Sequence, residues 1–168
     1  MKQKNGFTLI ELIVVVAVIL VISVLTILNY NSYTDKQRVK QSGMTLRSDL
    51  RLARTKATSG QKTALCDDTT VLESYNVEFS AVCGGKGPCY KIKPVCSNGG
   101  VLVDTTNEIT RVFLPSSVIF AGTNAYQTIR FFTVTGITNL ASDRIIVLSG
   151  SGVTYSIRVT TSGVISDY

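Results

Sequence analysis

Histidine is absent from this chain of 168 residues. The sequence therefore offers no Cys-His or Ser-His-Asp set, and no pair of carboxyl groups stands in a setting that would raise a pKa for acid-base catalysis. Structural zinc sites are also disfavoured, because they commonly combine histidine with closely spaced cysteines. We expect a protein that is not an enzyme and that uses no cofactor or metal.

Positive charge and proline are both missing from a long segment near the N-terminus. Residues 7–28 contain no Lys, Arg or Pro. The polar residues that interrupt this apolar run are Thr8, Glu11, Ser23 and Thr26. As a helix, these roughly 22 residues would be about 33 Å long, which is enough to cross the hydrocarbon core of a bilayer. We predict a membrane-spanning helix over residues 7–28.

A signal-peptidase site is lacking as well. No small-x-small pattern follows Leu28, so we expect the apolar segment to stay attached to the rest of the chain. Residues 1–6 precede the segment, and Lys2 and Lys4 favour a cytoplasmic location for that end. The chain is thus predicted to be a single-pass protein of the cytoplasmic membrane, with its larger part outside the cytoplasm.

Four cysteines lie in the part that is expected outside the cytoplasm: Cys66, Cys83, Cys89 and Cys96. An even number of cysteines in a small domain of that compartment predicts disulfides. Zinc is the alternative, but five and six residues intervene between the last three cysteines, unlike a Cys-x-x-Cys pattern. Three pairings are possible. We favour Cys83 with Cys89 across the segment 84–88, which leaves Cys66 with Cys96.

Beyond the apolar segment, residues 29–60 are expected to continue as an amphipathic helix, since no proline interrupts residues 7–58. Small and apolar residues recur there at steps of four and three, which is the pattern of a helix that packs on one side. This core stripe consists of Val39, Gly43, Leu46, Leu50, Ala53 and Ala57. Ser59-Gly60 is a C-terminal stop signal for the helix.

A basic stripe runs one residue away from the core stripe. It consists of Lys40, Arg47, Arg51 and Arg54. Residues 29–62 hold eight Lys or Arg and two Asp, a net charge of +6, whereas residues 63–168 hold seven against eight, a net charge of −1. The stripe is interpreted as a DNA contact or as a flank that faces solvent or another subunit, and the second reading is favoured because no aromatic residue is interleaved with the cations.

The remaining residues, 61–168, are predicted to form a β-rich globular head. Apolar and polar residues alternate in several short segments, and two apolar runs indicate buried strands. The predicted strands cover residues 75–81, 90–93, 112–114, 129–134, 145–148 and 153–159. Turn residues separate them at 98–100, 149–152 and 161–163. We expect an α+β protein in which short antiparallel strands form one or two sheets that rest on the core stripe.

Glu11 is a carboxylate inside the apolar segment. An ionised carboxylate in hydrocarbon costs about 3 kcal/mol on insertion scales, so a partner is expected. Cleavage between Gly6 and Phe7 would create a cation, because the new α-amino group of Phe7 lies one i to i+4 step from Glu11. In a bundle of staggered helices, Glu11 could instead neutralise the Phe7 amine of a neighbouring subunit, and a wrong register would leave both charges unpaired.

The segment Lys4-Asn5-Gly6-Phe7-Thr8-Leu9-Ile10-Glu11 resembles the class III signal of type IV pilins and type II secretion pseudopilins. In that family a membrane-embedded prepilin peptidase cuts after the glycine and methylates the new N-terminal phenylalanine, and the glutamate guides assembly into a helical filament. The resemblance implies these roles for Gly6, Phe7 and Glu11, with residues 1–6 as the leader peptide. It also implies the pilin fold, a long helix packed on a β head, and an assembly platform in the inner membrane.

Two looser patterns resemble the H-type pseudopilin and fimbrial T-type minor pilin group. One is the helix end at 52–61, followed by a strand expected at 62–66, and the other comprises residues 132–136 and 157–165. Members of that group that bind DNA carry arginines just after the last glycine. Here Gly163 is followed by Val164, which weakens the resemblance to the DNA-binding members.

These observations lead to three functional hypotheses. The first is a structural subunit of a type IV pilus or a type II secretion pseudopilus, which is anchored in the membrane and then joins other pilin subunits in a periplasmic or extracellular filament. The second is a minor pilin that binds DNA in natural transformation. The third is a surface protein with one membrane span that does not polymerise.

Overall fold

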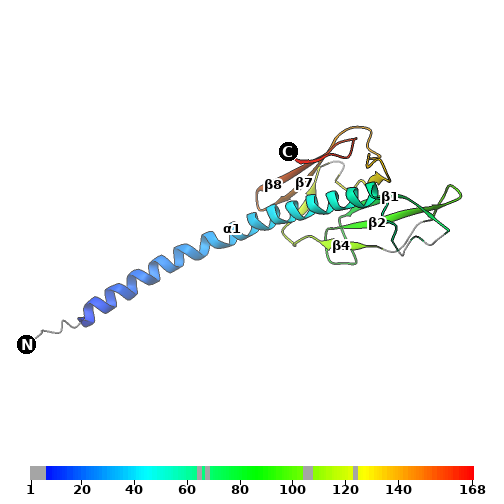
Figure 1. Cartoon of the computed structure of the whole chain (residues 1–168). Helices are drawn as coiled ribbons and strands as arrows, with labels where there is room; N and C mark the ends of the chain where they lie inside the picture. The colour runs from blue at the N-terminus through cyan, green and yellow to red at the C-terminus, as the bar shows by residue number, and fades with distance from the viewer. Residues whose placement is uncertain (1–6, 64–65, 67–68, 104–107, 123–124) are drawn as a thin grey trace, which may run out of the picture. The chain divides into compact units, whose positions relative to one another are not determined.

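The computed structural model describes residues 7–63, 66, 69–103, 108–122 and 125–168, with the backbone alone for residues 24–32 and 102–103. The chain divides into two compact units, Met1–Asp35 and Lys36–Tyr168, which we call the N-terminal unit and the globular unit. One helix, α1 (Leu9–Thr58), contributes to both, and the described strands all belong to the globular unit (Figure 1).

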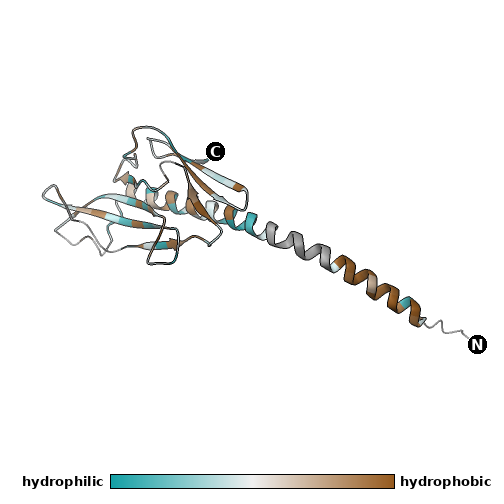
Figure 2. Ribbon diagram, turned by 180° about the vertical axis from the view of Figure 1, so that it is seen from behind, coloured by the Kyte–Doolittle hydropathy of each residue, from teal (hydrophilic) through white to brown (hydrophobic). Residues whose placement is uncertain are grey.

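In the N-terminal unit, α1 is apolar on all sides. Its described apolar side chains from Phe7 to Ile22 are about half exposed or more, and Figure 2 shows this stretch as almost continuously hydrophobic. Over the described residues, no helix reaches the combination of length and hydropathy expected of a membrane span. The predicted span of residues 7–28 includes residues 24–28, whose side chains lie outside the description.

In the globular unit, α1 buries one stripe. Every residue of the predicted core stripe is buried, and Val39, Leu46 and Leu50 have no exposed surface at all. They pack in one hydrophobic core with side chains from the two β-sheets of the globular unit. Gly43 allows a close approach to the second of these sheets, because a Cβ at this position would lie 2.1 Å from Cδ1 of Tyr155. The periodicity of the sequence therefore identified the packed face of this helix.

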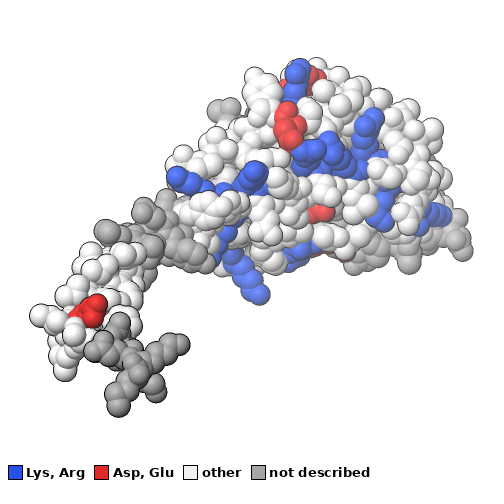
Figure 3. All heavy atoms as spheres, turned by 60° about the vertical axis from the view of Figure 1, so that its left-hand side comes forward, with Lys and Arg blue, Asp and Glu red and all other residues white. Residues whose placement is uncertain are grey.

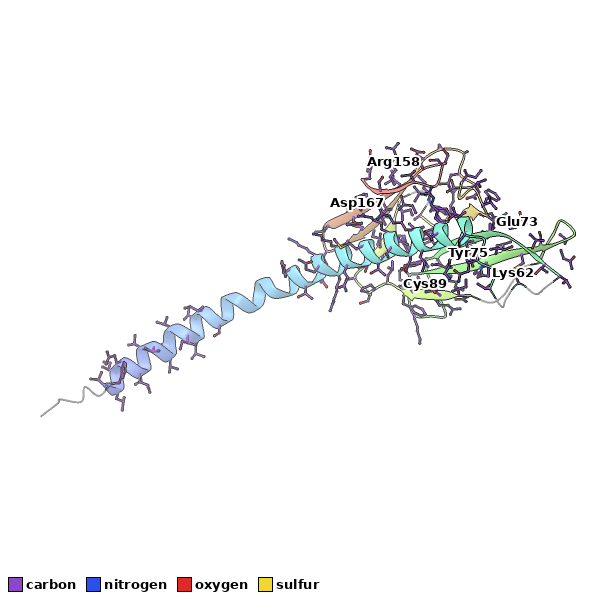
Figure 4. The ribbon with its side chains drawn as sticks, in the orientation of Figure 1. Lys62, Glu73, Tyr75, Cys89, Arg158 and Asp167 are labelled. Carbon is purple, nitrogen blue, oxygen red and sulfur yellow. A yellow bond between two sulfur atoms is a disulfide. The ribbon has the colours of Figure 1, made fainter. Side chains whose placement is uncertain are left out.

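The helix ends where the sequence predicts. The Gly60 N–H donates to the Ala57 carbonyl (3.0 Å) and the Gln61 N–H to the Lys56 carbonyl (3.1 Å), while Gly60 adopts a φ of 60°. This pair of bonds and the left-handed glycine form a Schellman motif, which satisfies carbonyls that the helix leaves open. The Tyr75 hydroxyl then donates to the Gln61 carbonyl (2.7 Å), which ties the helix end to the sheet below it (Figure 4).

The first sheet has the strand order β3-β2-β1-β6, and β4 also pairs with β2; every pairing is antiparallel. Its strands are β1 (Val71–Ser80), β2 (Cys89–Asn98), β3 (Val101–Val103), β4 (Thr110–Phe113) and β6 (Ile129–Phe132). Pro94 lies in β2 between the residues that pair with β4 (89–92) and those that pair with β3 (96–98). A residue without an N–H is tolerated there because neither ladder needs a donor from it.

The second sheet has the order β5-β7-β8-β9 and is also antiparallel. Its strands are β5 (Ile119–Ala121), β7 (Arg144–Gly150), β8 (Val153–Val159) and β9 (Ile165–Asp167). In the view of Figure 1, β7 and β8 of the second sheet are seen above the α1 residues of the globular unit, and β2 and β4 of the first sheet are seen below them. Each sheet has one face toward the helix, which explains why one stripe of α1 contacts side chains of both.

The predicted α+β fold is confirmed, and β8 coincides with the predicted strand 153–159. Two strand predictions need correction. The strand predicted at 129–134 ends at Phe132, because the chain turns back and Val134, with a φ of 67°, donates its N–H to the Ala57 carbonyl (3.2 Å). The strand expected at 62–66 is wrong for Lys62 and Thr63, which are irregular, and residues 64–65 lie outside the description.

Candidate processing and assembly site

The first turn of α1 is closed by a reciprocal pair of side chains. Thr8 precedes the first helical residue, and its Oγ1 accepts a hydrogen bond from the Glu11 N–H (3.3 Å). The Glu11 carboxylate in return accepts bonds from the Thr8 N–H (3.3 Å) and the Thr8 hydroxyl (3.3 Å). This is a capping box, which satisfies two backbone donors that the start of a helix leaves open.

The capping box changes the account of Glu11 that the sequence suggested. The sequence prediction gave Glu11 a partner only after cleavage, in the α-amino group of Phe7. In the structure, the uncleaved chain already holds the carboxylate through Thr8, at the positive end of the helix dipole. The pattern Thr8-x-x-Glu11 could have been recognised from the sequence, since a hydroxyl residue three positions before a glutamate is the usual signature of this cap.

The surroundings of the capping box are apolar and uncovered. Phe7 is 85% exposed, and Leu9, Ile10 and Leu12 are 76%, 71% and 62% exposed. The carboxylate is thus fixed among exposed apolar side chains, on a helix of the all-round hydrophobic kind that is normally buried in proteins. Gly6, the predicted residue before the cut, lies outside the described residues. Cleavage there would leave Thr8 and Glu11 together on the new terminus.

Most of the basic stripe contacts the globular unit itself. Arg47 forms an ion pair with Asp167, which also accepts a bond from the Tyr155 hydroxyl (2.7 Å), and Arg51 donates to the Ile165 carbonyl (3.0 Å). The Tyr155 hydroxyl and then the Arg47 guanidinium hold the pKa of the Asp167 carboxyl below its usual range. The helix cations therefore fasten the last strand, β9, to α1 (Figure 4 labels Asp167).

Arg54 and Lys40 differ from each other. Arg54 is half-buried between two turns: a Cβ at Gly163 would lie 3.1 Å from its Nε and one at Gly136 3.4 Å from it. Its Nε is buried, and this N–H donates no hydrogen bond within the described part of the chain. Lys40, at the other end of the stripe, is exposed. The four predicted residues thus line one side of α1 but do not form one open patch.

The cysteines pair as two disulfides, Cys66–Cys96 and Cys83–Cys89, which confirms the favoured pairing. Their Cα atoms are 5.8 and 6.0 Å apart, within the usual range for a bridge. The first bridge ties the chain after α1 to β2, and the second closes the loop before β2. Because all four sulfur atoms are used, the alternative of a zinc site at these cysteines does not apply.

Two hollows open on the globular unit. The larger, about 400 Å³, includes Asp143 and Arg144 in its lining, and the smaller, about 290 Å³, lies between α1 and β4. Asp143 accepts two bonds from the Arg158 guanidinium, from Nε (3.0 Å) and Nη2 (2.5 Å), and this lowers the pKa of its carboxyl. Burial lowers the pKa of Arg144 to about 10. The Asp143 carboxylate is thus paired with Arg158, and the Arg144 guanidinium donates to the Gln127 carbonyl.

Comparison with known families bears on the N-terminal site alone. Residues 1–27 match the family model described as the prokaryotic N-terminal methylation motif. No curated protein and no solved structure matches the chain. The matched residues include Gly6, Phe7 and the Thr8–Glu11 capping box. The motif indicates a substrate of prepilin-type cleavage and methylation, and it supports a type IV pilin-like protein.

Proposed function

We propose that this chain is the precursor of a filament subunit of the pilin and pseudopilin type. A prepilin peptidase cuts between Gly6 and Phe7 and methylates Phe7, and the apolar part of α1 holds the subunit in the cytoplasmic membrane before an assembly platform passes it to the filament. The observation that carries the proposal is the Thr8–Glu11 capping box, fixed among exposed apolar side chains within the matched motif.

The capping box gives Glu11 a role that depends on packing. Inside one helix the carboxylate has only weak hydrogen bonds of 3.3 Å to Thr8. Once the Phe7 amine exists, a neighbouring helix that is shifted along the axis can offer Glu11 a full positive charge. In a medium that excludes water, this charge pair is stronger than at a surface, and a misplaced neighbour leaves both charges unpaired.

Processing is tested by the intact mass of the chain from cells with and without an active prepilin peptidase. The expected product begins at Phe7 and carries one methyl group on its amine. A chain that still begins at Met1 where the peptidase is active contradicts the proposal.

Assembly is tested separately with Glu11→Ala, with Glu73→Ala as a matched control on the globular unit. The Glu11 variant should still insert into the membrane, but its amount in the sheared filament fraction should fall about tenfold or more, as expected for loss of one buried charge pair. The control should be incorporated normally. Incorporation of the Glu11 variant at the level of the control would overturn the assembly role of Glu11. Absence of the unaltered chain from the filament fraction would favour the hypothesis of a surface protein that does not polymerise.

DNA binding is not part of the proposal. Arg47 and Arg51 of the basic stripe are engaged with Asp167 and the Ile165 carbonyl, and a cation that is already paired gains less from a phosphate. The DNA hypothesis would be revived by binding of the full chain to duplex DNA that falls steeply as salt is raised, which is the signature of counterion release.

A further inference from the structure

Two pairs of cations on α1 differ in their contacts within the described residues. Arg47 and Arg51 contact β9. Lys36 and Lys40, which we call the lysine pair, are exposed and lie one helical turn apart. Within the described part of the chain, the lysine pair takes part in no ion pair or side-chain hydrogen bond. Figure 3 shows that Lys and Arg predominate over Asp and Glu on one face of the globular unit.

Two of the described acids of the globular unit are already paired with other cations. Glu78 pairs with Lys93 (3.0 Å), and Glu108 pairs with Lys91 (3.2 Å) and with Arg111. Within the described residues, the charge of the lysine pair is therefore open to an anionic partner from outside the chain.

The position of the lysine pair along the chain points to one anionic partner. Lys36 follows Leu28, the last residue of the apolar segment, by eight residues of the same helix, which is about 12 Å of helical rise. The headgroup layer on each side of a bilayer adds about 5–8 Å to the hydrocarbon core. Side chains on a helix lean toward its N-terminus, here the direction of the apolar segment, and lysine stems are long and flexible. The Lys36 ammonium can thus approach headgroup phosphates. Lys40, at about 18 Å of rise, lies farther out but within about one screening length, roughly 8 Å, of the headgroup layer once its stem is extended.

Local concentration favours a lipid over a soluble anion. Each lysine near an anionic surface contributes about 1 kcal/mol, which is too little for two lysines to hold a free phosphate from dilute solution. A chain anchored in the bilayer meets its headgroups at a very high effective concentration, so that weak contacts suffice. Lys and Arg are also less common beside the translocated end of a span, which makes a cationic pair there a feature that calls for a ligand.

We propose that Lys36 and Lys40 bind anionic phospholipid headgroups of the outer leaflet while the precursor is inserted. This inference rests on the proposed function, because it requires that residues 7–28 lie in the membrane. It assigns to the start of the globular unit a contact that must be released when a subunit leaves the membrane for the filament.

The test is lysine footprinting of the full chain in lipid nanodiscs. One sample contains phosphatidylcholine alone, and the other contains about one third phosphatidylglycerol. In the second sample, acetylation of Lys36 and Lys40 should be about fivefold slower, the equivalent of about 1 kcal/mol per lysine. At about 1 M salt, where the screening length is about 3 Å, the difference should disappear. Lys62, also exposed, should react equally in both discs and serves as the internal control.

A variant arm uses Lys36→Gln together with Lys40→Gln, with Lys62→Gln as the matched control. The double variant should retain less phosphatidylglycerol than the control when both are washed in detergent and their lipids are measured by mass spectrometry. Equal retention overturns the inference.

The other outcomes separate this inference from the proposed function. Equal acetylation rates in the two discs, in a chain that has inserted, overturn the lipid contact and leave the filament proposal standing. Slowing by inorganic phosphate in phosphatidylcholine discs to the same extent also overturns it, since the ligand is then a soluble anion. A chain that inserts into neither disc overturns the membrane step of the proposed function and the inference with it.

Discussion

The two parts of α1 have opposite relations to water, although they belong to one helix. From Leu9 to Ile22 the apolar side chains point in all directions and are exposed. After Lys36 most of them lie in the core stripe and are buried, and Met44 and Leu52 are the exposed exceptions. A sheet can cover only one side of a helix, so a stripe is what a globular core requires. Apolar side chains on all sides require surroundings that are themselves apolar, such as lipid or other helices.

The polar residues of the two parts carry different information. In the globular unit, Asp49 on α1 accepts a bond from the buried Tyr90 hydroxyl (2.5 Å), so that a polar group fixes the helix to the first sheet. In the N-terminal unit, the side-chain bonds of Glu11 to other described residues are those to Thr8 of its own helix end. The bond to Asp49 thus links α1 to another part of the fold. The bonds of Glu11 stay within one helix end, and we assign Glu11 to assembly.

The largest effect expected from this comparison comes from a matched pair of leucines. Leu50 is completely buried and Leu12 is 62% exposed. Leu50→Ala should lower the free energy of unfolding of the globular unit by about 3–5 kcal/mol, because it removes buried surface and leaves a cavity. Leu12→Ala should change it by less than about 0.5 kcal/mol.

The measurement is urea unfolding of the full chain in a nonionic detergent, followed by near-ultraviolet circular dichroism of the tyrosines. A Leu12 variant that destabilises the globular unit as much as the Leu50 variant would show that the two parts of α1 share one core, against the division described here.

A smaller effect is expected where helix and sheet approach most closely. Gly43→Ala places a methyl group where the Tyr155 ring lies, and overpacking of this kind costs about 1–3 kcal/mol. Alanine is a better helix former than glycine by about 1 kcal/mol, so the net loss should be about 0–2 kcal/mol. Ser48→Ala, on the exposed side of the same helix, is the control and should be neutral or slightly stabilising. A stabilised Gly43 variant would mean that Tyr155 moves aside without cost.

Much of this fold follows from local patterns in the sequence. The core stripe, the glycine stop at Gly60 and the strand 153–159 depend on periodicity and turn chemistry within a few residues, and all three agree with the structure. The three-residue strands β3, β5 and β9 were not predicted. Segments this short carry too few alternations to stand out, and their conformation depends on the neighbouring strand with which they pair.

The candidate sites were predictable to the same extent: local motifs could be recognised in the sequence, but contacts between distant residues could not. The motif around Gly6, Phe7 and Glu11 is contiguous and was recognised from sequence, and the cap by Thr8 could have been. The engagement of Arg47 by Asp167 could not, because 120 residues separate them and only the packing of β9 on the helix brings them together. A row of basic residues on a helix therefore indicates a charged face, but the folded chain decides which of its cations remain open.

The smallest expected effect concerns Glu108. Its carboxylate is paired within the globular unit, whereas the lysine pair on α1 is exposed. The Arg111 guanidinium, and after it the Lys91 ammonium, lower the pKa of the Glu108 carboxyl to about 2. In the unfolded chain a glutamate titrates near pH 4.3. A lowered pKa means that the folded state favours the ionised form, so the stabilisation is complete above about pH 5 and is lost as the pH falls from there toward 2.

Glu108→Gln should therefore lower the free energy of unfolding by up to about 1 kcal/mol at pH 6, the usual value for a partly exposed pair, and by nothing measurable near pH 2. Urea unfolding of both chains across this range measures the difference, with Glu73→Gln as the control. Glu73 is suitable because its carboxylate forms no ion pair within the described residues. If the difference in free energy of unfolding stays constant with pH, Glu108 stabilises the fold through packing. The contrast between the paired Glu108 and the lysine pair would then not be one of charge.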